Sequence, residues 1–237
     1  MANFCVLDCE TAPTVNHKDG KAPPETVFVY DFGFTLRGNE NNVNRERSFV
    51  VTDTFYQIDL MKSAYYADKI PTYYEGIKKG EWVEASFNEV WRTFKADCKE
   101  CNVKSAWAYN WRFDEIALNN TLRTYSNGFA TWFMPFKLRL KDVWDYASNI
   151  TSSKRYLKYC VATGAFTPSG NPSTSAESVY RFINNEHDFT EDHTALSDAR
   201  IEAAILLAAK AKHKKTRHGS RGQGWRDASA AFKTLDL

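Results

Sequence analysis

The sequence predicts an α/β domain in which a mixed β-sheet is covered by helices. Three strand-like segments follow one another near the N-terminus, and helical and strand-like segments alternate after them. That order is typical of a single mixed sheet flanked by helices. The hydrophobic fraction of 43% is large enough for a packed core, and a chain of this composition is not expected to be disordered.

The first three strands are predicted by apolar runs and by β-forming residues. Phe4–Glu10 is apolar until it reaches two carboxylates. Thr26–Leu36 is rich in β-branched and aromatic residues, and Arg45–Asp53 follows a turn over Arg37–Asn44 that contains Gly and Asn. Three successive strands of this kind predict an antiparallel meander.

The middle of the chain predicts one well-marked helix after two weaker ones. Asp59–Asp68 and Tyr73–Lys79 have only partial helical periodicity. Ser86 and Glu89 form a capping-box pattern, and apolar residues then recur at helical spacing as far as Cys101. The stretch 54–85 therefore enlarges the region between the third strand and this helix.

The remaining elements alternate between strand and helix. We expect strands at Val103–Tyr109 and Ala130–Phe136, and helices at Phe113–Tyr125, Lys141–Ala147, Lys154–Ala162, Ala176–Ile183 and Thr190–Lys215. Gly164–Ala176 combines Gly, Pro, Ser and Thr and is predicted to be a loop.

The charge distribution divides the chain into a domain over residues 1–209 and a basic tail over residues 210–237. Up to Leu207 there are 23 Lys and Arg against 27 Asp and Glu, whereas from Ala208 onwards there are 8 against 2. A basic tail, loosened by Gly219, Gly222 and Gly224, suits an attraction to phosphate. A solvated tail without a partner is the alternative.

The sequence also predicts the cellular location of the protein. Its apolar runs are short and its N-terminus lacks a secretory pattern, so we expect no membrane span and a cytoplasmic location. The cysteines are odd in number and scattered, which fits reduced thiols. Cys98 and Cys101 form a C-x-x-C pair, but no second pair of zinc ligands follows it.

A pair of acidic residues ends the first strand. Asp8 and Glu10 flank Cys9, and residues two apart on a strand project from the same face. Like charges held together repel unless a cation neutralises them, and carboxylate oxygens suit Mg²⁺ or Mn²⁺. Such a pair is, on its own, more often solvated than metal-bound.

Two further acidic motifs lie at the beginnings of predicted helices. Asn110-Trp-Arg-Phe-Asp114 follows an apolar strand, and His193-Thr-Ala-Leu-Ser-Asp198 precedes the long final helix. Taken singly, each motif has an explanation that needs no active site. Asp114 would be a carboxylate that interacts with the dipole at the start of a helix, and His193 would belong to the entry of a helix with acidic residues near its N-terminus. Taken in order with the first motif, they indicate a shared acidic site.

The three motifs together resemble those of the DEDDh, or DnaQ-like, 3′→5′ exonucleases. The matching residues are Asp8-x-Glu10 with Thr11, Asn110-x-x-Phe-Asp114, and His193-x₄-Asp198, and Gly33 falls where the family commonly has a glycine. Thr194 stands where the related tyrosine-bearing subclass would need Tyr, so the pattern is that of the histidine subclass.

This resemblance implies a ribonuclease H-like fold, with a five-stranded mixed sheet whose first three strands are antiparallel. It also implies that Asp8, Glu10, Asp114 and Asp198 bind two divalent ions and that His193 is the general base. The implied reaction is metal-dependent hydrolysis from the 3′ end that releases nucleoside 5′-monophosphates.

The expected substrate is single-stranded nucleic acid, with DNA or 3′ overhangs preferred. Residues beside the motifs are candidates for binding its 3′ end: Cys9, Thr11, Ala12, Asn110 and Trp111. The tail lysines and arginines are candidates for binding its backbone. An exoribonuclease or oligoribonuclease with the same chemistry stays open, as does a polymerase-associated proofreading or binding accessory. A virus-encoded enzyme that acts in a host cell would suit this composition.

Overall fold

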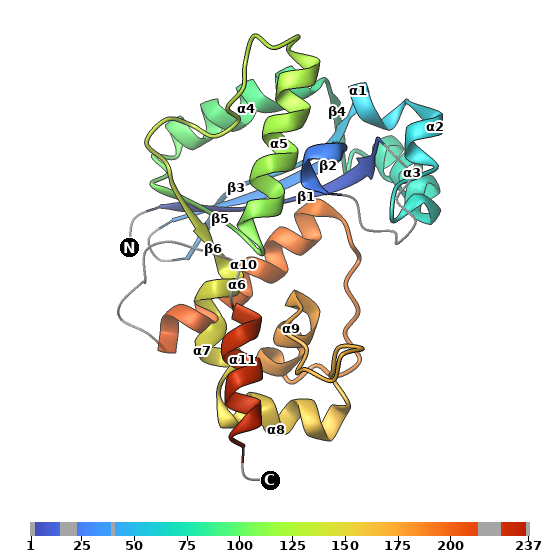
Figure 1. Ribbon diagram of the computed structural model, residues 1–237. Coiled ribbons are helices and arrows are strands. Elements are labelled where there is room, and N and C mark those ends of the chain that lie inside the picture. Colours follow the sequence, from blue (N-terminus) through green and yellow to red (C-terminus); the bar gives the residue numbers. More distant parts are fainter. Residues whose placement is uncertain (1–2, 15–22, 39–40, 213–223, 236–237) are drawn as a thin grey trace. The chain divides into compact units, whose positions relative to one another are not determined.

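The computed structural model describes residues 3–14, 23–38, 41–212 and 224–235 (Figure 1). They fall into two compact units. The first consists of Met1–Ala106, Phe113–Leu140 and Asp192–Ala199, and the second of Trp107–Arg112, Lys141–Glu191 and Arg200–Leu237. None of the described helices is long and apolar enough to cross a bilayer.

A mixed sheet with strand order β4-β3-β2-β1-β5-β6 confirms the predicted fold class. Its strands are β1 (Phe4–Pro13), β2 (Val27–Arg37), β3 (Val43–Val51), β4 (Val83–Ala85), β5 (Ser105–Ala108) and β6 (Arg139–Asp142). β1 pairs antiparallel with β2, and β2 antiparallel with β3, as the sequence predicts. The sheet has one strand more than the resemblance implies, because the short β4 pairs parallel with β3.

The predicted strand at Ala130–Phe136 is wrong. Successive residues of a strand point to opposite faces, yet Phe133 and Met134 are consecutive and both are buried. The segment is irregular, and the sixth strand begins later, at Arg139. The composition of the segment favoured a strand. In the structure, Phe133 and Met134 are buried in the core, whereas Trp132 and Phe136 are exposed.

Two helices cover one face of β1–β3 (Figure 1). α4 (Phe87–Glu100) starts at the predicted capping box, since Ser86 and Glu89 satisfy each other's backbone N–H groups. α5 is Trp111–Tyr125. Aromatic rings fill the layer beneath these helices: Phe94 meets Phe34 edge-on, with ring centroids 5.1 Å apart.

The first turn of α10 packs on the strands through Gly33. This helix (Ala195–Lys212) starts five residues after the predicted Thr190, because residues 190–194 are irregular and His193 has a positive φ. Gly33 lies opposite Asp8 in the sheet, and a Cβ atom on it would collide with the backbone of Ala195 and Leu196. The absence of a side chain at this position therefore lets the helix approach β1.

We expect Gly33→Ala to destabilise the protein by about 1–3 kcal/mol, because the added methyl group meets helix backbone that can yield only by moving. Urea unfolding of the variant measures the change. The matched control is Thr35→Val on the same strand, since the buried Thr35 hydroxyl has no hydrogen-bond partner and valine has the same shape. Equal midpoints for Gly33→Ala and the unaltered protein would contradict this packing.

The enlarged middle forms three short helices with their own core. They are α1 (Thr52–Phe55), α2 (Ile58–Met61) and α3 (Ile70–Lys79), which gather near the end of β1 (Figure 1). Phe55, Met61 and Tyr73 pack with Tyr30 and Ala12 of the strands. Helix is confirmed at both predicted places, although α2 is much shorter than Asp59–Asp68.

The second unit is mainly helical. Its helices are α6 (Val143–Tyr146), α7 (Ser148–Thr151), α8 (Lys154–Thr163), α9 (Ala176–Asn184), the later part of α10, and α11 (Gly224–Lys233). α8 and α9 confirm the predicted helices to within one residue. The helix predicted at Lys141–Ala147 begins only at Val143, because Lys141 and Asp142 belong to β6.

The predicted loose tail is corrected where the structure describes it. α11 occupies its later part, with Ala228 fully buried and the Gly224 N–H donating to Asp145 Oδ1 at 3.1 Å. Its small residues and Phe232 let it pack as a helix, and Phe232 meets Phe166 with ring centroids 5.4 Å apart. The predicted basic segment 213–223 lies outside the described residues.

Candidate active site

Three carboxylates from distant parts of the chain meet beside β1. One oxygen each of Asp8, Glu10 and Asp198 lies within 4.8 Å of the others. Asp8 and Glu10 project from the same face of the strand, as strand alternation requires. Asp198 reaches them from the first turn of α10, which the contact at Gly33 holds close to the sheet.

Asp31 fixes the start of that helix from within β2. Its side chain is fully buried, and its Oδ2 accepts hydrogen bonds from the Ala195 N–H at 2.9 Å and the Tyr73 hydroxyl at 2.8 Å. Burial raises the pKa of Asp31 to about 6, although these two hydrogen bonds oppose the shift. The carboxylate is therefore largely ionised at neutral pH and caps the first N–H of α10.

The electrostatics of the three-carboxylate group suit a divalent cation. Burial raises the pKa of Glu10 well above its ordinary value, and the nearby Asp8 and Asp198 raise it further, while Lys69 opposes the shift. A bound cation would offset this repulsion, and hard divalent cations prefer oxygen ligands such as these carboxylates. The residues present therefore fit Mg²⁺ or Mn²⁺.

Asp114 lies close to β1 but outside the three-carboxylate group. It is 3% exposed in the first turn of α5, and its Oδ1 accepts a hydrogen bond from the Cys9 thiol at 3.3 Å. Burial, and then the charge of Asp114, raise the pKa of Cys9, so the thiol stays protonated and can donate. Cys9 thus orients one of the predicted metal ligands.

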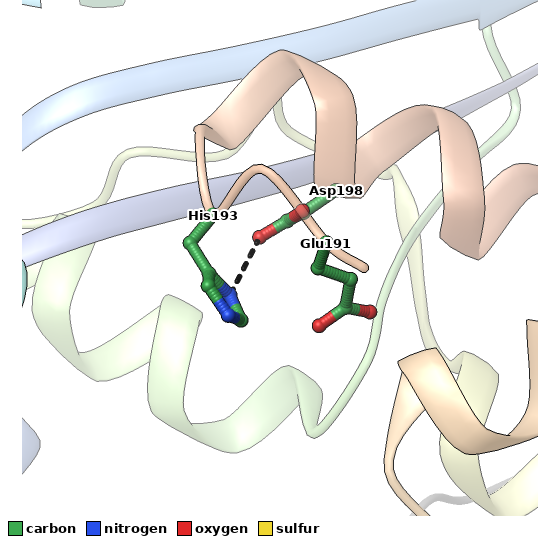
Figure 2. A group of neighbouring side chains, drawn as sticks. All are labelled: Glu191, His193 and Asp198. Atoms are coloured by element: carbon green, nitrogen blue, oxygen red, sulfur yellow. Dashed lines mark ion pairs between the residues drawn. The ribbon is translucent and has the colours of Figure 1, made fainter. Parts of the chain in front are cut away.

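His193 stands directly before α10 in a left-handed backbone conformation, with φ of 47°. Its Nδ1 is 4.0 Å from Asp198 Oδ2, and its side chain is 31% exposed (Figure 2). The same figure draws Glu191, which belongs to the second unit. Burial, and then the charge of Glu177, raise the pKa of Glu191 to about 7. Histidine in this place is close enough to the carboxylates to exchange a proton with a bound water.

A tyrosine from the enlarged middle stacks on this histidine. The rings of Tyr66 and His193 are nearly parallel, at 13°, with centroids 4.5 Å apart. Lys69 extends the contact, because its Nζ lies 5.2 Å from the centre of the Tyr66 ring and donates to the Asp192 carbonyl beside His193. The segment before α3 therefore helps to hold the histidine in place.

For the hydrolysis that the sequence motifs predict, we expect Tyr66→Leu to reduce kcat about fivefold with little change in KM, because the loss of roughly 1 kcal/mol of ring stacking lets His193 turn away from the carboxylates. Tyr66→Phe keeps the ring and should retain nearly full activity. Steady-state kinetics on a labelled oligonucleotide measure both variants. Equal losses in the leucine and phenylalanine variants would instead assign the effect to the hydroxyl group.

The predicted substrate-binding residues differ in their exposure. Asn110 is exposed and Thr11 is half-buried, so both remain candidates. Ala12 is fully buried in the core, Cys9 bonds to Asp114, and Trp111 is only 4% exposed. The low exposure of these three favours a packing role, and substrate contact by all five residues stays a prediction.

Asp142 determines where α5 begins. Its carboxylate accepts the N–H groups of Asn110 at 3.2 Å and Trp111 at 3.1 Å, and it also accepts the N–H of Trp144 at 2.8 Å. One buried acid thus caps two helices. Since Asp114 is three residues further along α5, this cap fixes the turn that carries it.

Sequence reasoning missed Asp31, Tyr66 and Lys69. Asp31 had a usable signal, because an aspartate inside a strongly apolar strand needs a partner when it is buried. Tyr66 and Lys69 had none, since the stack depends on how a poorly patterned segment folds back along the chain.

Neither a protein-family model nor a curated protein matches the chain by sequence. Solved structures of exonuclease I do resemble its fold. One is E. coli exonuclease I in complex with a dT13 oligonucleotide, with a TM-score of 0.55 and 14% identity over 89% of this chain and 41% of that one. An ExoI/SSB-Ct complex gives a TM-score of 0.57 and 14% identity over 90% and 42%.

A third structure of exonuclease I gives a TM-score of 0.53 and 16% identity over 90% of this chain and 42% of that one. This chain therefore spans less than half the length of the exonuclease I chains that it resembles. At these identities the likeness establishes the fold.

Proposed function

We propose that this protein is a metal-dependent 3′→5′ exonuclease of the DEDDh type, which hydrolyses single-stranded DNA or 3′ overhangs to nucleoside 5′-monophosphates. The observation that carries the proposal is the meeting of Asp8, Glu10 and Asp198 beside His193. A histidine next to clustered carboxylates is suited to hydrolysing a phosphodiester, and the likeness of the fold to exonuclease I supports the proposal.

The chain's own residues have distinct roles in this proposal. Asp8, Glu10 and Asp198 would bind two Mg²⁺ or Mn²⁺ ions, with Asp114 as the fourth ligand beside Cys9. When bound, such ions lower the pKa of a water molecule and neutralise charge on the leaving oxygen.

His193 would take the proton of the attacking water through a ring nitrogen, while the Tyr66 stack keeps the ring facing the carboxylates. Asp31 would keep α10, and with it Asp198, in place during turnover. Thr11 and Asn110 would be candidates to contact the terminal nucleotide.

DNA is the preferred substrate because the similar exonuclease I structure holds a dT13 oligonucleotide. RNA is the alternative substrate. Its sugar carries a 2′-hydroxyl group, so a polar residue of the site would have to form a hydrogen bond with that group. An accessory role beside a polymerase is the remaining possibility, and it predicts binding without hydrolysis.

One experiment distinguishes these possibilities. Matched DNA and RNA strands, labelled at either the 3′ or the 5′ end, are incubated with the protein in Mg²⁺, Mn²⁺ or EDTA. The proposal expects immediate release of a labelled mononucleotide from 3′-labelled DNA, gradual shortening of 5′-labelled DNA, and no reaction in EDTA. Mononucleotide release from the 5′ end, or undiminished cleavage in EDTA, would overturn it.

A further inference from the structure

An aromatic surface projects from the segment that joins α5 to β6. Phe129 is 91% exposed, Phe136 is 87% exposed and Trp132 is 47% exposed, all within eight residues of the chain. We call Phe129, Trp132 and Phe136 the aromatic surface. Several large apolar side chains that are this exposed within one short segment of a folded protein suggest a binding site.

The segment is anchored, so the exposure of these rings does not come from a loose loop. Phe133 is fully buried, its N–H donates to Asn119 Oδ1 at 2.8 Å, and its carbonyl accepts from Trp91 Nε1 at 2.9 Å. The Ser126 hydroxyl accepts from the Ala130 N–H at 3.0 Å and closes the turn before it. The anchors hold the backbone while the neighbouring rings point outward.

Positive charge accompanies the rings. Residues 116–140 contain Arg123, Lys137 and Arg139 and no acidic residue. Lys137 lies 5.7 Å from the centre of the Phe136 ring, and on α4 the exposed Lys95 lies 4.3 Å from the centre of Trp91, whose indole bonds to the same segment. Alternating aromatic rings and cations are suited to a polyanion that carries flat bases.

We propose that the aromatic surface binds single-stranded nucleic acid by stacking its bases, with Lys137 and Lys95 contacting its phosphates. This proposal rests on the proposed function and adds a second binding site to it. The aromatic surface follows Tyr125, which ends α5 and lies about 16 Å along the helix from Asp114 in its first turn. It would therefore hold the strand several nucleotides away from the 3′ end that is cut.

The geometry favours nucleic acid over a protein partner because the surface is basic as well as apolar. The apolar core of a protein interface is depleted in charged residues. Exposed rings with a cation beside one of them, as Lys137 lies beside Phe136, fit stacked bases better than the apolar face of a partner helix or strand.

The test measures binding without hydrolysis. Fluorescence anisotropy in EDTA gives the Kd of a labelled 25-nucleotide DNA strand and of a labelled trinucleotide. Phe129→Leu/Phe136→Leu keeps apolar side chains but removes the rings, whereas Phe129→Tyr/Phe136→Tyr keeps the rings. Both pairs change exposed positions, so the fold should survive, and circular dichroism confirms that it does.

The proposal expects the leucine pair to raise the Kd for the long strand about tenfold or more, and the tyrosine pair to leave it nearly unchanged. Binding and hydrolysis of the trinucleotide should be unaffected by either pair. An unchanged Kd for the long strand in the leucine pair would overturn the proposal.

Three further outcomes separate this proposal from its alternatives and from the proposed function. Sedimentation that shows a dimer, made monomeric by the leucine pair with unaltered DNA affinity, would assign the surface to a second copy and overturn the proposal. If the protein cuts no strand, but the leucine pair still lowers its affinity for the long strand, the proposal for the aromatic surface stands and only the proposed nuclease function is refuted. If the protein cuts both lengths equally well with and without the rings, the nuclease function stands and the proposal for the aromatic surface is refuted.

Discussion

Asp198→Asn is expected to reduce hydrolysis of single-stranded DNA by about a thousandfold or more, which corresponds to about 4 kcal/mol. The substitution preserves the shape of the side chain but removes the negative charge that completes the group with Asp8 and Glu10. We expect Asp8→Asn to have an effect of the same size. Initial rates on a labelled strand at saturating Mn²⁺ measure both.

A thermal unfolding assay shows whether the loss comes from the metal. Mn²⁺ should raise the Tm of the unaltered protein, since a cation that binds the folded state stabilises it, and the rise should be much smaller in Asp198→Asn. The control is Asp188→Asn, which changes an exposed acid and should preserve both the rate and the shift. Full activity of Asp198→Asn in Mg²⁺ would refute the proposed site.

His193→Ala is expected to slow hydrolysis by about a hundredfold to ten-thousandfold, while the rise in Tm with Mn²⁺ stays. The ring is placed to accept a proton, and the carboxylates that would hold the ions are not altered. This combination of a lost rate and a retained metal response distinguishes a base from a ligand.

His187→Ala is the matched control for this variant, because His187 is also stacked on a tyrosine ring, with centroids 5.7 Å apart, but is exposed in the second unit. It should leave the rate unchanged. If His193→Ala kept the rate and lost the Mn²⁺ response, the histidine would have to be reassigned as a ligand.

Much of the site follows from local rules that the sequence obeys. Strand alternation places Asp8 and Glu10 on one face, and a helix that starts near His193 brings Asp198 into its first turn. The capping box at Ser86 and Glu89 marks the start of α4 to the residue. These features could be predicted because they depend on interactions between residues that are close together in the sequence.

What the sequence did not reveal depends on distant contacts. Ala130–Phe136 has the composition of a strand, but Phe133 is drawn into the core beneath α4 and the residues around it cannot pair. Tyr66 reaches His193 only because the segment before α3 folds back along the end of β1. Trp111 is a candidate for substrate binding because it stands beside the second motif, but the sequence does not show that tertiary packing buries its ring.

The two hydrogen bonds to Asp31 join α3 of the enlarged middle to the start of α10. Because Tyr73 of α3 and the first amide of α10 share one oxygen, detaching α3 would also expose the carboxylate that caps α10. The two segments should therefore open together as one cooperative unit in hydrogen exchange. In such an experiment, the amide proton of Ala195 would report on the stability of a segment more than a hundred residues away.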